Sequence, residues 1–395
     1  MSGIIYIDEN GVKFDASRIC TPDCTRSMIC FRGRKSTLSR ILFTVVVVVI
    51  FIYLFQLRWM TQPRKVVGPI VHAEEEQFPL AFSILMYTDL DRTVRLMQAI
   101  YRPHNCYCIH VDRKTDESIH TTLKQLMQQL YGDTVYVIPR ERSIKVEWGW
   151  IHSQDADLLC SRILLDRCSQ WKYWINLTGQ EFPLRTNWEL VRALTILNGS
   201  NLIDAIYKRR NMDRFPLHWR SGFPVTWYKG VPHVVARREF VHFIHNDERA
   251  KLILRVLRDF EQSKKHGIFV DETYLPTLNH NPASIPAPGA FLGVHESDIF
   301  TPPIRVKVWS DQNMPCHSGK WVRTICMLGL RDVDWLMKRP EFFANKFIPS
   351  VEPEGYTLME RWLSEKVEYE SINGKLHPSF NTTHYLSLEL RWNHL

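Results

Sequence analysis

Several short catalytic motifs are missing from this 395-residue sequence. It contains neither the G-x-G-x-x-G string of dinucleotide-binding folds nor the G-x-x-x-x-G-K-[ST] string of a P-loop, so a dinucleotide or NTPase site is not expected. G-x-S-x-G and H-E-x-x-H are also missing, which removes the main signals for serine hydrolases and zinc peptidases. No internal repeat is visible, and no basic and aromatic repeats indicate a nucleic-acid partner.

One long hydrophobic run stands near the N-terminus of a chain that is otherwise globular in composition, with 45% hydrophobic and 23% charged residues. The run Ile41–Leu57 carries no charge. At roughly 1.5 Å per residue it spans about 25 Å, and Trp59 and Met60 extend it toward the thickness of a bilayer core. A cleaved signal peptide would lie nearer the N-terminus and end in small residues. We therefore predict one transmembrane signal-anchor at residues 41–60.

The flanks of this run favour a cytoplasmic N-terminus, because more basic residues precede it than follow it. Those before it are Arg26, Arg32, Arg34, Lys35 and Arg40; those after it are Arg58, Arg64 and Lys65. The predicted organisation is a cytoplasmic tail (1–40), the anchor (41–60), a short stem (61–77) rich in charge and proline, and a lumenal domain (78–395). The net charge of +8 lies partly in these flanks, so it does not require a nucleic-acid partner.

Six cysteines follow the anchor, and in an oxidising compartment they can form three disulfides. They are Cys106, Cys108, Cys160, Cys168, Cys316 and Cys326. Three N-x-[ST] sequons also lie in this part of the chain, beginning at Asn176, Asn198 and Asn381. We expect Asn176 to be buried because its run is apolar, and we predict glycosylation at Asn198, which precedes a glycine turn, and at Asn381.

From Pro79 onward, apolar strands alternate with segments of helical periodicity. Strands are predicted at 80–88, 105–112, 134–139 and 172–178, with helices over 89–101, through Leu123 and Leu126, and over 153–165. This order favours an α/β fold with a mostly parallel sheet and crossover helices. Ligands bind at the carboxyl ends of such strands. Asp112 and the segment GQEFPLRTN after Thr178 occupy those ends.

Three D-x-D strings resemble the metal-binding motif of many nucleotide-sugar transferases. They begin at Asp89, Asp155 and Asp332. Each opens a predicted helix or lies within one, where helix caps and polar faces explain the acids. We therefore expect no metal ligand among them. Without a metal, a departing diphosphate needs cationic side chains, and Arg323 and Lys346 are candidates, although a surface cation with a buried stem is the simpler interpretation of each.

The acidic pair Asp271–Glu272 stands between an apolar run and a proline-rich segment. Pro276 cannot lie deep in a helix that Asp271 caps, because it lacks a backbone donor. A helix starting near Thr273 would instead place Pro276 in its first turn. Glu272 would then belong to the loop before the helix, where it could face a cleft.

Five segments carry a resemblance to a known family. They are AIYRPHNCYCIHVDRKTDES, WKYWINLTGQEFPLRTNWELVRAL, YKGVPHVVARREFV, VDETYLPTL and WVRTICMLGLRDVDWLMKRPEFFANKF. Over roughly residues 78–370 the chain resembles the core-2/I-branching β-1,6-N-acetylglucosaminyltransferase family, which includes peptide xylosyltransferases. The resemblance implies a type II Golgi membrane protein with a GT-A-like fold. It also implies inverting sugar transfer from a UDP-sugar to a glycan or glycoprotein hydroxyl, without a metal or other cofactor.

The same resemblance assigns roles to residues. Glu272 falls on the catalytic base, Arg323 and Lys346 on the pair that binds the UDP diphosphate, and Asp112 beside the nucleotide. It pairs Cys108 with Cys160, and Cys316 with Cys326. Cys106 and Cys168 remain, and a parallel bridge between them is expected because Cys106 and Cys108 share a strand face while Cys160 and Cys168 lie on one side of a helix.

The sequence departs from the family pattern in two places. Leu275 and Pro276 replace the aromatic and small residues expected after the base, and residues 201–219, where the family recognises its acceptor, do not align residue by residue. Trp309 in RVKVWSDQ is a candidate platform for stacking on a sugar, with core packing as the alternative.

Three functions follow. The first is a Golgi β-1,6-N-acetylglucosaminyltransferase that branches O-glycan cores. The second is a relative that uses UDP-glucose or UDP-xylose. The third is a membrane-anchored carbohydrate-binding protein without turnover, which would need neither a base nor a diphosphate-binding pair.

Overall fold

The computed structural model describes residues 6–7, 13–14, 70–208, 211–218, 222–293 and 302–395. The predicted anchor at 41–60 lies outside these ranges. Within the described ranges, no helix is both long enough and apolar enough to cross a bilayer. The chain divides into two compact units, Met1–Pro63 and Arg64–Leu395. In the first unit, strand β1 (Tyr6–Ile7) pairs antiparallel with β2 (Lys13–Phe14).

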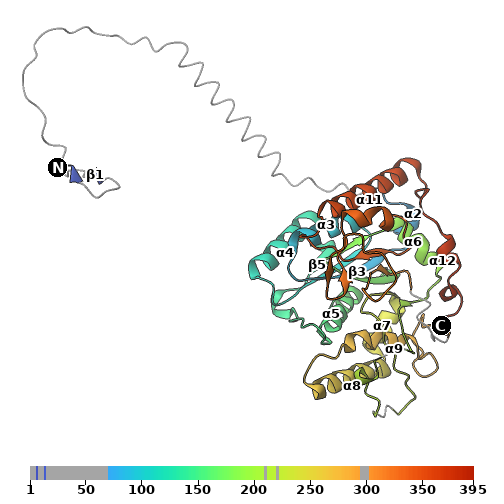
Figure 1. Ribbon diagram of the computed structural model, residues 1–395. Coiled ribbons are helices and arrows are strands. Elements are labelled where there is room, and N and C mark those ends of the chain that lie inside the picture. Colours follow the sequence, from blue (N-terminus) through green and yellow to red (C-terminus); the bar gives the residue numbers. More distant parts are fainter. Residues whose placement is uncertain (1–5, 8–12, 15–69, 209–210, 219–221, 294–301) are drawn as a thin grey trace, which may run out of the picture. The chain divides into compact units, whose positions relative to one another are not determined.

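A six-stranded sheet forms the centre of the larger unit (Figure 1). Its order is β5-β4-β3-β6-β9-β8, in which β3 pairs in parallel with both β4 and β6, β4 pairs in parallel with β5, and β9 is antiparallel to its neighbours β6 and β8. The strands are β3 (Leu80–Met86), β4 (Cys106–Val111), β5 (Val135–Val137), β6 (Tyr173–Thr178), β8 (Leu202–Ile203) and β9 (Val234–Arg237). The predicted α/β class with a mainly parallel sheet is confirmed.

Helices cross between the parallel strands as the periodicity predicts. They are α3 (Leu90–Ile100), α4 (Glu117–Tyr131) and α5 (His152–Arg167). The first two begin at acidic N-caps: Asp89 accepts a hydrogen bond from the Arg92 amide, and Asp116 accepts one from the Ser118 amide. These caps fix where each helix begins, because they satisfy backbone donors that have no partner inside the helix.

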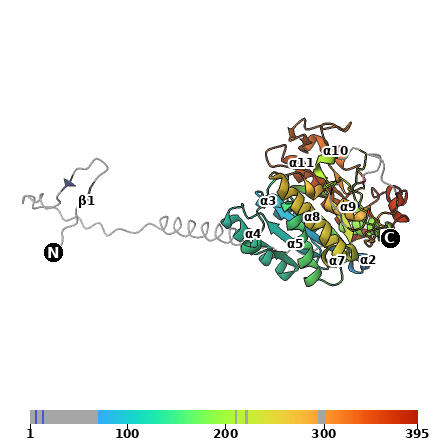
Figure 2. The same cartoon turned by 90° about the horizontal axis from the view of Figure 1, so that it is seen from below.

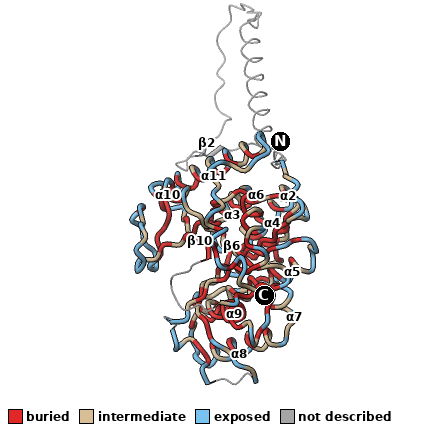
Figure 3. Tube along the Cα trace, turned by 90° about the vertical axis from the view of Figure 1, so that its right-hand side faces the viewer, coloured by how far each residue is buried: buried red, intermediate tan, exposed pale blue. Residues whose placement is uncertain are grey.

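Two hydrophobic cores lie on opposite faces of the central sheet, because successive strand residues point to opposite sides. Leu80, Phe82 and Ile84 of β3 pack in the core that includes residues of α3, α4 and α6 (Asn187–Ile196). Ala81 belongs to the other core, which α5, α7 (Arg238–Asn246) and α8 (Glu248–Lys264) cover. Figure 2 shows these last three helices together, and Figure 3 shows the buried residues gathered along the sheet. The result is a three-layer α/β/α arrangement.

A smaller three-stranded sheet has the order β10-β13-β7. Its core contains Phe182, Val306 and Ala344 and packs against α10 and α11. The remaining elements are α2 (Ala73–Glu76), β7 (Glu181–Pro183), α9 (Tyr274–Asn279), β10 (Arg305–Val306), β11 (Trp321–Val322), β12 (Ile325–Cys326), α10 (Val333–Leu336), β13 (Phe343–Asn345), α11 (Glu354–Asn373) and α12 (Thr383–Leu386). Because β7 follows β6 directly, this sheet extends from the carboxyl end of a central strand.

Two of the three expected disulfides are present. Cys106–Cys168 joins β4 to the end of α5, and Cys316–Cys326 closes a short loop. The expected Cys108–Cys160 bridge is not formed: both residues are buried free thiols, and the Cys160 Sγ–H donates to the Cys108 carbonyl oxygen at 3.5 Å. Both side chains are fully buried, and there they pack as small apolar side chains.

The three sequons differ in exposure. Asn176 is buried and its amide donates to Asp157 Oδ2 and to the Pro232 carbonyl oxygen, so the expectation of burial is confirmed. Asn198 is exposed in a turn with a φ of 53°, and Asn381 is exposed. Glycosylation of these two remains a prediction.

Candidate active site

The carboxyl ends of β3 and β6 mark the point where the chain order in the sheet reverses. From β3 the chain proceeds outward through β4 to β5, and then returns to the other side of β3 as β6. In open α/β sheets a ligand crevice lies at such a point.

Asp112 directly follows β4, as predicted, and only 5% of it is exposed. Its backbone amide donates to the Met86 carbonyl oxygen at the end of β3, at 2.8 Å. Its carboxylate accepts from the Lys114 amide at 2.9 Å. A neighbouring loop is joined here as well, because the Arg113 amide donates to the Ile144 carbonyl oxygen. Asp112 therefore has a fixed position beside both the sheet and the loop that leads to Trp148.

Glu272 ends a short 3₁₀ turn, η4 (Val270–Glu272), and α9 begins just after Thr273. The expectation that a helix starts near Thr273, with Pro276 in its first turn, is confirmed. The Glu272 side chain is 19% exposed, so it is held by the protein yet open to solvent. Its neighbour Asp271 is more deeply buried and accepts a hydrogen bond from the Ser153 hydroxyl at 2.7 Å.

Pro276, where the sequence departs from the family pattern, lies against Gly230. A Cβ on Gly230 would lie 2.6 Å from Pro276 Cγ and 2.1 Å from the Asp204 carbonyl oxygen, so only glycine fits there. The Gly230 amide donates to the Glu272 carbonyl oxygen at 2.7 Å. Pro276 thus packs against the residue that holds the backbone of Glu272.

Positive charge surrounds the Glu272 carboxylate. Burial raises its pKa, and the charges of Lys229, Arg214 and Lys307 oppose that rise. Arg214 makes the direct contact, with its Nη1 3.0 Å from Glu272 Oε2. A carboxylate in this setting can accept a proton while its charged form is still supported by nearby cations.

Arg323 lies in the two-residue turn of the hairpin formed by β11 and β12. Arg323 and Thr324 have φ angles of 48° and 65°, the left-handed conformation that tight hairpin turns require. The Arg323 guanidinium lies 4.9 Å from the centre of the exposed Trp148 ring. The stacking directs the hairpin tip toward the loop that follows β5.

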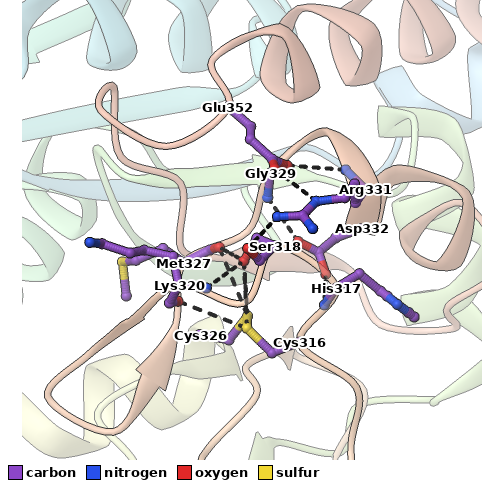
Figure 4. Close-up of polar contacts among 10 residues, drawn as sticks. All are labelled: Cys316, His317, Ser318, Lys320, Cys326, Met327, Gly329, Arg331, Asp332 and Glu352. Atoms are coloured by element: carbon purple, nitrogen blue, oxygen red, sulfur yellow. Dashed lines mark hydrogen bonds and ion pairs between the residues drawn. A yellow bond between two sulfur atoms is a disulfide. The ribbon is translucent and has the colours of Figure 1, made fainter.

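The base of this hairpin is anchored by polar contacts (Figure 4). The Ser318 hydroxyl donates to the Met327 carbonyl oxygen at 2.6 Å, beside the Cys316–Cys326 disulfide. Asp332 accepts from the amides of His317 and Gly329 at 2.8 and 2.9 Å. These contacts fix the residues that lead into and out of the hairpin. Arg323 therefore lies at the tip of a hairpin whose base is held in place.

Lys346 follows β13 and lies close enough to Arg323 for their charges to repel. Burial lowers the pKa of Lys346, and Arg323 lowers it further. Among the described residues, neither cation forms an ion pair with an acid. Two neighbouring cations without an acidic partner form a site suited to an anion such as a phosphate.

Lys307 connects the two groups electrostatically. Burial lowers its pKa to about 8, repulsion from Lys346 adds to this effect, and attraction to Glu272 and Glu181 opposes it. Lys307 Nζ lies 4.6 Å from the centre of the Trp309 ring. Trp309 itself is partly buried against Ile325, Met327 and Val351. The packing of Trp309 is observed, and its stacking on a sugar stays a prediction.

A buried ion pair lies next to Lys307 and Lys346 in the chain. Arg305, two residues before Lys307, donates to Glu181 at 2.5 Å, and both side chains are at most 3% exposed. Glu181 also accepts from the Asn345 side chain at 3.3 Å. Since Asn345 precedes Lys346, this pair holds the backbone of both lysines.

The three D-x-D strings lie at helix starts or inside helices, as expected. Asp89 caps α3, Asp157 lies within α5 and accepts from Ser83 and Asn176, and Asp332 precedes α10. In the part of the chain that the structure describes, no cluster of three or more His, Cys, Asp and Glu side chains is arranged to hold a metal ion.

Sequence reasoning missed four residues of this site: Trp148, Arg214, Phe269 and Lys307. Lys307 had a visible signal, because two cations alternate with apolar residues in IRVKVW, and an internal cation in a buried strand needs an explanation. Arg214 lies in the segment that does not align with the family, so no motif marked it.

The fold is α/β with a mainly parallel central sheet, and polar residues follow its strands at their carboxyl ends. The family model "Branch: Core-2/I-Branching enzyme" matches residues 80–337. The chain belongs to this family, and it is a glycosyltransferase of the β-1,6-N-acetylglucosaminyltransferase type.

Two relatives illustrate the similarity. The chain is 30% identical over 332 residues to the "Beta-1,3-galactosyl-O-glycosyl-glycoprotein beta-1,6-N-acetylglucosaminyltransferase 4" of Danio rerio, covering 77% of this chain and 74% of the relative. It is 30% identical over 336 residues to the "N-acetyllactosaminide beta-1,6-N-acetylglucosaminyl-transferase" of Mus musculus, covering 79% of each. A solved structure, mouse xyloside xylosyltransferase 1 in its apo form, aligns at 13% identity with a TM-score of 0.28 over 50% of this chain and 81% of that chain, too weakly to bear on the fold.

Proposed function

We propose that this chain transfers N-acetylglucosamine from UDP-GlcNAc to a glycan hydroxyl with inversion, without a metal ion, and forms β-1,6 branches on O-glycan cores. The observation that carries the proposal is the pairing of a partly buried carboxylate, Glu272, with two cations that have no acidic partner among the described residues, Arg323 and Lys346. Lys307 interacts with both groups. The two named relatives act on galactosyl-O-glycosyl-glycoprotein and N-acetyllactosaminide acceptors, which supports a galactose-containing acceptor.

In the proposed reaction Glu272 acts as the general base. A sugar hydroxyl is a weak nucleophile, so the carboxylate takes its proton as the oxygen bonds to the anomeric carbon. The bond from that carbon to the diphosphate oxygen breaks, and its electron pair leaves with UDP. Attack opposite the leaving group inverts the anomeric configuration, by the geometry that holds for inverting glycosidases.

Arg323 and Lys346 bind the diphosphate in this scheme. Their fixed positive charge stabilises the charge that develops on the leaving group, the role that a divalent ion plays elsewhere. Asp112 lies beside the nucleotide and Trp309 beside the acceptor. The catalytic unit has a GT-A-like fold and is lumenal (78–395), joined by the stem (61–77) to a Golgi signal-anchor (41–60) with a cytoplasmic tail (1–40).

The test uses the full-length chain with UDP-GlcNAc, UDP-glucose and UDP-xylose, and with Galβ1-3GalNAc and lactosamine as acceptors. Glu272→Gln should retain UDP affinity within about twofold and lose at least about 100-fold in transfer rate, because a general base contributes about 10²–10⁴. Glu239→Gln is the matched control, since Glu239 also pairs with an arginine, Arg237, at 2.8 Å, but lies outside the site.

Transfer by Glu272→Gln at the parent rate would refute the assignment of the base. Complete loss of transfer in EDTA would refute the metal-free mechanism. A preference for UDP-glucose or UDP-xylose would keep the mechanism and replace the donor. UDP-sugar binding without any transfer would favour the carbohydrate-binding alternative.

A further inference from the structure

Among the described residues, the Glu272 carboxylate has one direct ionic partner. Arg214 ends the 3₁₀ turn η3 (Met212–Arg214), and its Nη1 lies 3.0 Å from Glu272 Oε2. The two side chains are only 21% and 19% exposed, so water screens this pair less than a surface ion pair. Among the described residues, Arg214 is the one hydrogen-bond donor to the Glu272 side chain, and it engages a single oxygen.

Arg214 is itself held in place by an aromatic ring. Its guanidinium carbon lies 4.4 Å from the centre of the Phe269 ring. Phe269 has a φ of 60°, and its amide donates to the Gly149 carbonyl oxygen at 2.7 Å. The Trp148 ring meets the Phe269 ring edge-on at 4.7 Å between centres. The arginine is therefore constrained by a face-on ring on one side and by the carboxylate on the other.

This arrangement leaves the two carboxylate oxygens in different environments. Oε2 is bound to Arg214, whereas Oε1 accepts no hydrogen bond from the residues that the structure describes. A base needs a fixed orientation and one accessible oxygen to remove a proton from a hydroxyl. Because Arg214 contacts Oε2 alone, Oε1 keeps its acceptor sites for a proton.

We propose that Arg214 is a positioning residue for Glu272: it holds Oε2 and leaves Oε1 for the proton of the acceptor hydroxyl. This inference rests on the proposed role of Glu272 as the base. Arg214 lies in the segment that the resemblance assigns to acceptor recognition and that does not align residue by residue, and in this chain that segment contacts the proposed base.

Several charged groups surround Glu272, and each affects its ionisation. Lys229, Arg214 and Lys307 stabilise the carboxylate, while Asp271 interacts with it as a like charge. Removing the positive charge of Arg214 disfavours the ionised base. The acidic limb of the pH profile, below which Glu272 is protonated and inactive, therefore moves to higher pH in the variant.

The experiment compares kcat, KM and the pH profile of kcat/KM for full-length Arg214→Gln, Arg214→Lys and Lys264→Gln. Lys264 is the control, because its Nζ also lies over a phenylalanine ring, 5.0 Å from the centre of Phe260, but among the described residues it pairs with no acid. For Arg214→Gln we expect kcat to fall about tenfold to 100-fold, in line with one charge-assisted hydrogen bond, and the acidic limb to move up by about one pH unit. Arg214→Lys should recover part of both effects, and UDP affinity should stay within about twofold of the parent.

Parent-like kcat and pH profile in Arg214→Gln would overturn the inference. A loss of rate with an unshifted acidic limb, and without rescue by Arg214→Lys, would overturn it as well. Glu272→Gln measured alongside separates the two claims. If that variant keeps the parent rate, the proposed base is wrong; if it is inactive while Arg214→Gln is parent-like, only the role of Arg214 is wrong.

Discussion

The Glu272 side of the site (Glu272, Arg214 and Lys229) and the Lys346 side (Arg323, Lys346 and Trp148) carry positive charge in different ways. On the Glu272 side, one of the two cations, Arg214, is bound to the carboxylate at 3.0 Å, so its charge is balanced by an acid. On the Lys346 side, two cations repel each other and contact no acid among the described residues; the Arg323 guanidinium lies over the neutral Trp148 ring.

This difference indicates what each side does. A balanced pair tunes the ionisation and orientation of a group that is already present. Unbalanced cations gain most when an anion arrives from outside. Changes on the Glu272 side should therefore alter rate and pH dependence, and changes on the Lys346 side should alter the binding of a diphosphate.

The largest effect is expected for Lys346→Ala, which removes half of the unbalanced charge. Transfer should fall about 10²–10³-fold, the range seen when one donor that stabilises developing charge is lost. UDP affinity, measured by calorimetry, should fall while uridine affinity does not. Lys338→Ala is the control, because Lys338 is an exposed cation outside the site. Equal losses for UDP and uridine would contradict a role in diphosphate binding and would erase the contrast between the two sides.

A smaller effect is expected for Lys307, which interacts with both sides. Its pKa is lowered to about 8, so its ammonium loses a proton as pH rises through that value. If the charge supports transfer, kcat should decline above about pH 8. Lys307→Arg keeps its charge to much higher pH, so the alkaline limb should move upward even if kcat falls about tenfold at neutral pH. An alkaline limb that stays near pH 8 in Lys307→Arg would assign that limb to another group.

The smallest effect is expected for Trp148, which touches Arg323 but is not itself charged. A cation–π contact at an exposed site contributes about 0.5–1 kcal/mol. Trp148→Ala should therefore weaken UDP binding about twofold to fivefold, and Trp148→Phe should restore most of it. The position of the acidic limb should not change. A shifted acidic limb in Trp148→Ala would show that this ring acts through Phe269 on the Glu272 side instead.

The layers of the fold were predictable from the sequence because local patterns and global packing agree. Leu80, Phe82 and Ile84 alternate with Ala81 and Ser83, and the structure assigns the first set to one core and Ala81 to the other. The Thr273 helix start was predictable because proline chemistry leaves few positions for Pro276. Such inferences use neighbours in the chain, which the sequence displays directly.

The surroundings of Glu272 were less accessible for the opposite reason. Arg214 lies 58 residues from Glu272 in the chain, and nothing local to either position indicates their contact. The cysteine pairing shows the same limit. The resemblance implies Cys108–Cys160, and Cys106–Cys168 is expected only as a bridge parallel to it; a shared strand face alone cannot say which of the two pairs forms a bond.

The contact between Gly149 and Gly267 has a consequence for how this chain can change. A Cβ on Gly267 would lie 2.6 Å from the Gly149 carbonyl carbon, so the loop after β5 and the loop before η4 meet backbone against backbone. Gly267 then cannot take a side chain while the Gly149 loop keeps its shape, so a change in either loop affects the other. Attempts to alter sugar selectivity by exchanging loops between relatives should transplant the two segments as a pair, and natural insertions should arise in both or in neither.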